Sequence, residues 1–114
     1  MESGALAAKE WITLLERPTA VFCSCDEVAF GFNSALYRNG FRAPRDVSVV
    51  GFDEVLLAEF AIPSLTTIRR PHLETGLQAV KLLLQLMQNP NEQQQSIYLK
   101  GDLIIRESAY RFQN

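Results

Sequence analysis

The feature that most constrains this chain is a short run rich in β-branched residues that ends at a glycine. The run spans residues 47–50 and is followed directly by Gly51. Such a run is typical of a strand that is covered on both faces in a parallel sheet. Ligands of these sheets bind beyond the carboxyl ends of the strands, and Asp53 lies just past this end. We therefore expect a parallel sheet with Asp53 at its ligand-binding edge.

Helix and strand patterns alternate along the rest of the chain. The predicted helices span residues 5–15, 26–39, 53–60 and 71–87, and the predicted strands span residues 20–23, 47–51, 65–68, 97–100 and 103–106. Asp26 is expected to cap the second helix, and Gly40 is expected to end it in a left-handed conformation. Strands that alternate with helices predict a doubly wound α/β fold.

Length and charge narrow the range of functions. The 114 residues fit one small domain. The formal net charge of −2 gives no basic excess, so this chain is not expected to bind the phosphate backbone of a nucleic acid by itself. No apolar run approaches the length of a signal peptide core or a membrane span, and we expect a cytoplasmic protein that does not enter a membrane.

The two cysteines, Cys23 and Cys25, lie two residues apart. This spacing on a strand does not suit a disulfide. With the single histidine, His72, they could suggest a metal site, but zinc needs a fourth ligand and no residue offers it at a fitting spacing. Buried thiols without a metal or another cofactor are the prediction.

Several motifs match a known family in order and at the right spacing. They are the segments 17–22 and 26–31, then Gly40, Pro44 and the stretch 46–69. Over residues 17–108 the chain resembles the C-terminal part of transcription regulators of the lactose-repressor/galactose-repressor family. The resemblance implies a periplasmic-binding-protein-like effector domain, in which two α/β lobes close around a small effector such as a sugar or a nucleoside.

The resemblance also implies that the chain is only part of such a domain. Residues 1–70 would belong to the C-terminal lobe, residues 71–101 would cross to the N-terminal lobe, and residues 102–114 would form the return strand and tail. Operator DNA would then be reached only through a helix-turn-helix headpiece that these residues do not include. The apolar stripe of the helix 71–87 would lack its docking surface, which favours association of the chain.

Four residues are candidates for effector binding. In the family, the aspartate that matches Asp53 accepts hydrogen bonds from effector hydroxyls, and the alternative role is that of a cap for the following helix. Asp26 has the same two alternatives. Cys25 stands where sugar-responsive relatives often carry asparagine, which leaves a nucleobase or nucleoside open. Arg70 stands where relatives often carry glutamine, and it could bind an anionic ligand or remain a solvated charge.

A candidate dimer interface lies on the helix 26–39. One of its faces is apolar enough to bind the sheet, whereas Phe30 and Tyr37 point the opposite way beside Asn33 and Ser34. Such an outer face suggests a protein interface, with isolated surface aromatics as the alternative. In the family this helix and the turn after the Gly-Phe-Asp motif form the dimer contact, which adds Leu56 and Phe60. We expect a homodimer or a higher oligomer.

Other classes of protein fit less well. A receiver domain needs an acidic pair after its first strand and a lysine after its last, and neither is present. A hydrolase would need a Gly-x-Ser-x-Gly elbow, which is absent, and an enzyme is not predicted. A periplasmic sugar-binding protein shares the fold but would carry an export signal. The interpretation is the effector-binding and dimerisation region of a repressor, with a periplasmic-type binding protein or a receiver-like domain as the alternative.

Overall fold

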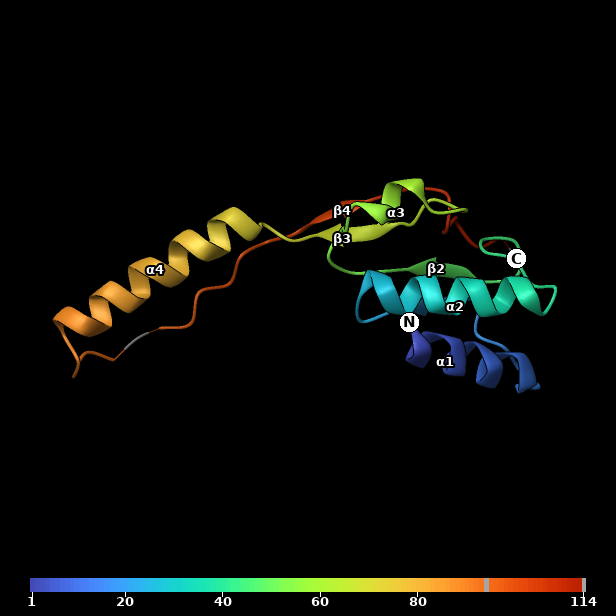
Figure 1. Ribbon diagram of the computed structural model, residues 1–114, viewed down its shortest axis with the longest axis horizontal. Coiled ribbons are helices and arrows are strands. Elements are labelled where there is room, and N and C mark those ends of the chain that lie inside the picture. Colours follow the sequence, from blue (N-terminus) through green and yellow to red (C-terminus); the bar gives the residue numbers. More distant parts are fainter. Residues whose placement is uncertain (94, 114) are drawn as a thin grey trace. The chain divides into compact units, whose positions relative to one another are not determined.

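The computed structural model describes residues 1–93 and 95–113 (Figure 1). Its elements, in chain order, are α1 (Glu2–Thr13), β1 (Ala20–Phe22), α2 (Asp26–Arg38), β2 (Ser48–Val50), α3 (Leu57–Phe60), β3 (Thr67–Arg69), α4 (His72–Gln88) and β4 (Asp102–Ile104). The chain forms two compact units. The first contains Met1–Arg69 together with the chain from Leu103 onward, and the second contains Arg70–Asp102.

Parallel strands organise the first unit. β1 and β2 pair in parallel, with Val21 opposite Val49. Two single parallel bridges, Val50 to Thr66 and Asp53 to Arg69, continue this pairing toward β3, which pairs with β4. α2 lies in the crossover that connects β1 to β2, which is the usual connection between two consecutive parallel strands. The predicted α/β architecture with a parallel sheet is therefore confirmed.

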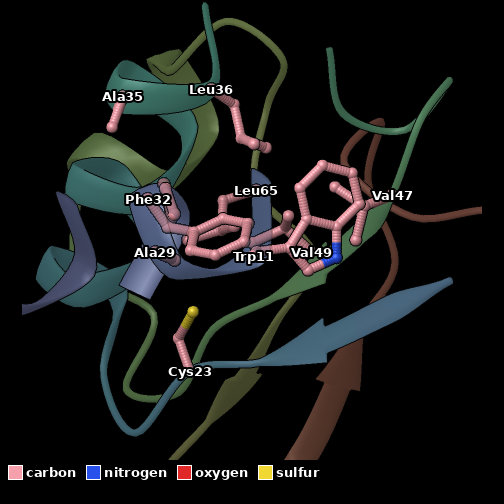
Figure 2. Close-up of a cluster of buried hydrophobic side chains, with 11 residues drawn as sticks. Trp11, Cys23, Ala29, Phe32, Ala35, Leu36, Val47, Val49 and Leu65 are labelled. Carbon is pink, nitrogen blue, oxygen red and sulfur yellow. The ribbon is translucent and has the colours of Figure 1, made fainter. Parts of the chain in front are cut away.

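The core of the first unit lies between α1, α2 and the strands (Figure 2). α2 buries the face that its periodicity predicts, and α1 packs along it. Trp11 of α1 is 5% exposed and donates its indole N–H to the Pro18 carbonyl at 3.0 Å. Val47 and Val49 are 1% and 0% exposed, which confirms the buried strand. The largest fully buried side chains include Phe32, Leu36 and Leu65.

Most elements lie within three residues of their predicted bounds, and Gly40 has the expected positive φ, +83°. The cap role expected of Asp26 and the alternative cap role of Asp53 are both wrong. Cys25, not Asp26, is the N-cap residue of α2. The helix expected from residue 53 begins only at Leu57, with Leu56 as its N-cap, so Asp53 does not cap it. Asp53 and Glu54 have positive φ and cannot continue into a right-handed helix.

The strand predicted for residues 97–100 is also wrong. These residues have no regular structure, and Ile97 and Tyr98 are 47% and 93% exposed. A strand is stabilised by hydrogen bonds to a neighbouring strand, and the described residues supply no partner for this segment. Its β-branched and aromatic residues alone do not form one.

The second unit is dominated by α4, and none of the side chains of this helix is buried. Its exposed apolar side chains are Leu73, Leu77, Val80, Leu83, Leu84, Leu86 and Met87. Across residues 1–93 and 95–113, no helix has the length and apolar character needed to cross a membrane.

A buried carboxylate joins three segments of the first unit. The Asp26 side chain is 0% exposed. Its Oδ1 accepts a hydrogen bond from Thr67 Oγ1 at 2.6 Å, and its Oδ2 accepts one from the Val55 N–H at 2.8 Å. A β-carbon on Gly51 would lie 2.2 Å from Oδ1. The carboxylate thus connects the start of α2 to β3 and to the loop before α3, and only glycine at position 51 leaves room for it.

Replacing Gly51 by alanine should therefore lower the free energy of unfolding by about 2 to 4 kcal/mol, because the new β-carbon would displace a buried carboxylate from its donors. Gly76→Ala in α4 is the matched control, since a β-carbon there meets no atom within 4 Å. Urea unfolding, followed by the fluorescence of Trp11, the single tryptophan, measures the free energy of unfolding of both variants. Equal midpoints for the two variants would contradict the tight enclosure of Asp26.

Candidate functional site

The carboxyl ends of three neighbouring strands form one edge of the first unit. Cys25 follows β1, Asp53 follows β2, and Arg69 ends β3. The loops are tied together because the Asp26 N–H donates to the Phe52 carbonyl at 3.0 Å and the Asp53 N–H donates to the Ile68 carbonyl at 2.9 Å. The structure therefore brings Cys25 and Asp53 to adjacent strand ends, where open α/β sheets bind ligands.

Asp53 has an unusual backbone. Its φ is +118°, and that of Glu54 is +58°. Residues with a β-carbon rarely occupy this region, at a cost of about 1 to 3 kcal/mol each, and they concentrate at ligand sites. The Asp53 side chain is half-buried. The site thus combines a carboxylate at a sheet edge with a backbone that the surrounding structure must hold in place.

The other predicted effector residues differ in their surroundings. Asp26 lies at the same edge, but its carboxylate is fully enclosed and hydrogen-bonded within the protein. Cys25 is half-buried at the N-terminus of α2. Arg70 is exposed and belongs to the second unit. Of the four candidates, Asp53 and Cys25 combine a position at this edge with partial exposure.

Both cysteines are free thiols. Cys23 points into the hydrophobic cluster (Figure 2), and burial, aided by the nearby Cys25 and Asp26, raises the pKa of its thiol to about 11. Cys23 therefore stays protonated and unreactive at neutral pH. The described residues contain no group of three histidine, cysteine or acidic side chains that could hold a metal ion.

An ion-pair cluster beside Asp53 was missed by the sequence reasoning. The Glu54 carboxylate pairs with Arg69 and, at 2.9 Å, with Arg106. The hydrogen bond from Arg69, followed by that from Arg106, holds the pKa of the Glu54 carboxyl below its ordinary value. Arg106 lies 52 residues away in sequence, and no local pattern connects two charges at that separation.

A groove lies between α2 and α3, and we call it the α2–α3 groove. Its volume is about 440 Å³, and its lining includes Phe30, Asn33, Ser34, Tyr37, Leu57 and Phe60. Tyr37, Leu57 and Phe60 are 65%, 65% and 69% exposed. Five of the six predicted interface residues thus line one hollow.

Two details refine this surface. Phe30 is half-buried and also packs against the core. Leu56, the sixth predicted interface residue, does not line the groove but is 79% exposed at the start of α3. The buried Oδ1 of Asn33 has no hydrogen-bond partner among the residues that the structure describes. A buried acceptor without a donor is rare in folded proteins.

Comparison with known proteins identifies the family. The pattern of the periplasmic binding protein-like domain matches residues 1–109. The chain is 41% identical to the ribose operon repressor of Haemophilus influenzae over 109 residues, which are 96% of the chain and 33% of that protein. It is also 41% identical to the transcriptional repressor CytR of Escherichia coli, covering 95% of the chain and 32% of that repressor.

Solved structures agree with this relationship. A putative transcriptional regulator LacI from Bacillus cereus subsp. cytotoxis superimposes with a TM-score of 0.89 at 34% identity, over 96% of this chain and 39% of that one. A LacI family regulator from Enterococcus faecium with bound ribose superimposes with a TM-score of 0.79 at 32% identity, over 95% and 39% of the two chains.

These comparisons cover nearly all of the present chain, whereas it spans about a third of the length of the curated relatives that it matches. The chain belongs to the LacI-type family of transcriptional regulators, within their periplasmic-binding-protein-like effector domain.

Proposed function

We propose that this chain is the part of a LacI-type repressor that binds a small effector with one lobe and joins two subunits. Residues 1–70 would belong to the C-terminal lobe, residues 71–101 to the segment that crosses to the N-terminal lobe, and residues 102–114 to the return strand and tail. The region would act by binding rather than by catalysis, in the cytoplasm. Effector binding in the longer protein would change operator affinity by the coupling free energy between the two sites.

The position of Asp53 carries the effector part of this proposal. The residue sits at the carboxyl end of β2 in a strained, half-buried conformation, and its carboxylate is suited to accept hydrogen bonds from hydroxyl groups. Cys25 would line the same site. Asp26 would support the effector site from the interior of the first unit, because its buried carboxylate accepts a hydrogen bond from the Val55 N–H, two residues after Asp53. Arg70 would contribute from the crossing segment.

A pentose or a nucleoside is the proposed class of effector. One relative is named for the ribose operon, and two solved regulators contain ribose. The aromatic pair at the same edge supports this class, since Phe22 is 65% exposed and its ring lies 6.4 Å from that of Phe52. An exposed ring can cover the apolar face of a sugar or stack on a base.

A hybrid protein tests the role of Asp53. The chain would replace the corresponding third of the Haemophilus influenzae ribose operon repressor, and calorimetry would measure the affinity for ribose. Asp53→Asn should weaken binding by roughly ten- to a hundredfold, because a charge-assisted hydrogen bond is worth about 1.5 to 3 kcal/mol. Asparagine tolerates a positive φ, so the backbone should keep its conformation.

The control for this substitution is Asp102→Asn on β4, where the side chain is exposed. It should leave the ribose affinity unchanged. An unaltered affinity of the Asp53→Asn hybrid would rule out the ligand role. A loss of affinity accompanied by a loss of thermal stability would mean that Asp53 is structural. If the unmutated hybrid binds neither ribose nor a ribonucleoside, the proposed effector class is wrong.

The α2–α3 groove is the proposed homodimer face. Its exposed aromatic and apolar lining, with Leu56 beside it, is typical of a protein interface core. The unpartnered Oδ1 of Asn33 supports a donor from the second subunit. A related lac repressor has been solved as a dimer bound to operator. The apolar side chains of α4 would add to association of the isolated chain.

Phe60→Glu should abolish dimerisation at micromolar concentration, because a carboxylate buried without a partner at an interface costs several kcal/mol. Phe112→Glu is the control, since Phe112 is 60% exposed, comparable to Phe60, but does not line the groove. Analytical ultracentrifugation of the 114-residue chain measures the dimerisation constant of both variants. The same dimerisation constant for Phe60→Glu as for the unmutated chain would place the interface elsewhere.

A further inference from the structure

Three successive residues at the sheet edge are each held by a different neighbour. The Asp53 N–H donates to the Ile68 carbonyl at 2.9 Å. The Glu54 side chain binds two arginines, and the Val55 N–H donates to Asp26 Oδ2 at 2.8 Å. The two residues with positive φ therefore lie within a segment that is anchored at every position.

Glu54 makes the most extensive of these contacts. Its Oε1 accepts hydrogen bonds from Arg69 Nη2 and from Arg106 Nη2, both at 2.9 Å, and its Oε2 accepts one from Arg69 Nε. The side chains of Glu54 and Arg106 are only 14% and 15% exposed. Water therefore screens this pair much less than an ordinary surface salt bridge.

Arg106 is itself fixed in position. Its Nη1 donates to the Leu65 carbonyl at 3.0 Å, and its backbone N–H donates to Thr66 Oγ1 at 2.9 Å. An anchored guanidinium has already lost much of its conformational freedom, so it binds Glu54 at a lower entropic cost. Glu54 is thus attached to a rigid part of the first unit.

The two arginines belong to the segments that connect the two units. Arg69 is the last residue before the chain enters the second unit, and Arg106 follows soon after the chain returns at Leu103. One carboxylate therefore binds the outgoing and the returning segment. The residue that precedes it in sequence is Asp53.

We propose that Glu54 is a positioning residue, whose ion pairs with Arg69 and Arg106 hold Asp53 in its left-handed backbone conformation and attach it to both connecting segments. Without these pairs the segment would relax, because a residue with a β-carbon disfavours positive φ. The role of Asp53 in binding a ligand rests on the proposed function. The claim that the ion pairs of Glu54 keep the backbone of Asp53 in its conformation does not.

Amide hydrogen exchange in the 114-residue chain, measured by NMR, directly tests whether the ion pairs of Glu54 hold the backbone of Asp53. Glu54→Gln should accelerate exchange of the Asp53 and Val55 amides at least tenfold, while the Ala29 amide in α2 keeps its rate. Glu59→Gln, an exposed position on α3, is the control and should change none of these rates. Unchanged Asp53 and Val55 rates in Glu54→Gln would overturn the proposal.

A second pair of variants separates the side chain from the backbone. Glu54→Ala removes the ion pairs and keeps the unfavourable φ, whereas Glu54→Gly removes the ion pairs and relieves it. In the hybrid with the ribose repressor, alanine should lower ribose affinity about tenfold, and glycine should recover at least half of that loss on a logarithmic scale. A glycine variant no better than alanine would overturn the positioning role.

These readouts separate the two proposals. If the unmutated hybrid does not bind ribose but Glu54→Gln still accelerates amide exchange in the 114-residue chain, the proposed effector is wrong. The proposal that Glu54 holds the Asp53 backbone is then supported. A hybrid that binds ribose normally in all Glu54 variants contradicts the positioning role and leaves the proposed effector in place.

Discussion

The first unit depends on one buried carboxylate. Asp26 lies at the start of α2, and its two oxygens bind Thr67 of β3 and the backbone of the loop after β2. A polar side chain removed from water is stable only when its acceptors are satisfied by donors. The donors here come from residues that follow Asp26 by 29 and 41 positions. The carboxylate therefore requires that helix, loop and strand assemble together, and Gly51 must leave space for it.

This arrangement gives the sheet edge and the α2–α3 groove a common element. α2 begins at the edge, where Cys25 and Asp26 meet the loop that carries Asp53. The outer face of the same helix contributes Phe30, Asn33 and Tyr37 to the groove. A packed helix moves as a rigid body rather than bending locally. A displacement of α2 on effector binding would thus also move the side chains of the proposed subunit contact. Such a shared element is the physical requirement for linkage between effector binding and subunit association.

Part of the candidate site could be predicted because it depends on local order. The position of Asp53 after a buried strand, and the outward direction of Tyr37 on a helix of known phase, follow from the periods of strand and helix. The cap roles were wrong because they depend on the backbone at single residues. Asp53 and Glu54 have left-handed conformations that their side chains do not reveal, so the expected helix begins at Leu57 instead. The strand expected at residues 97–100 fails because pairing, not propensity, makes a strand.

The sequence by itself determined the α/β class, the buried strand and the apolar face of α2, because burial on one side of a regular element imposes a period that can be read along the chain. Only the tertiary structure decided the partners of the charged groups. Asp26 is an enclosed hydrogen-bond acceptor, and Glu54 pairs with Arg106, which lies 52 residues away in sequence. Folding brings such groups together, and their separation along the chain carries no information about their distance in space. Electrostatic and hydrogen-bonding contacts act over a few ångströms. Their partners are therefore determined by the packing of the folded chain.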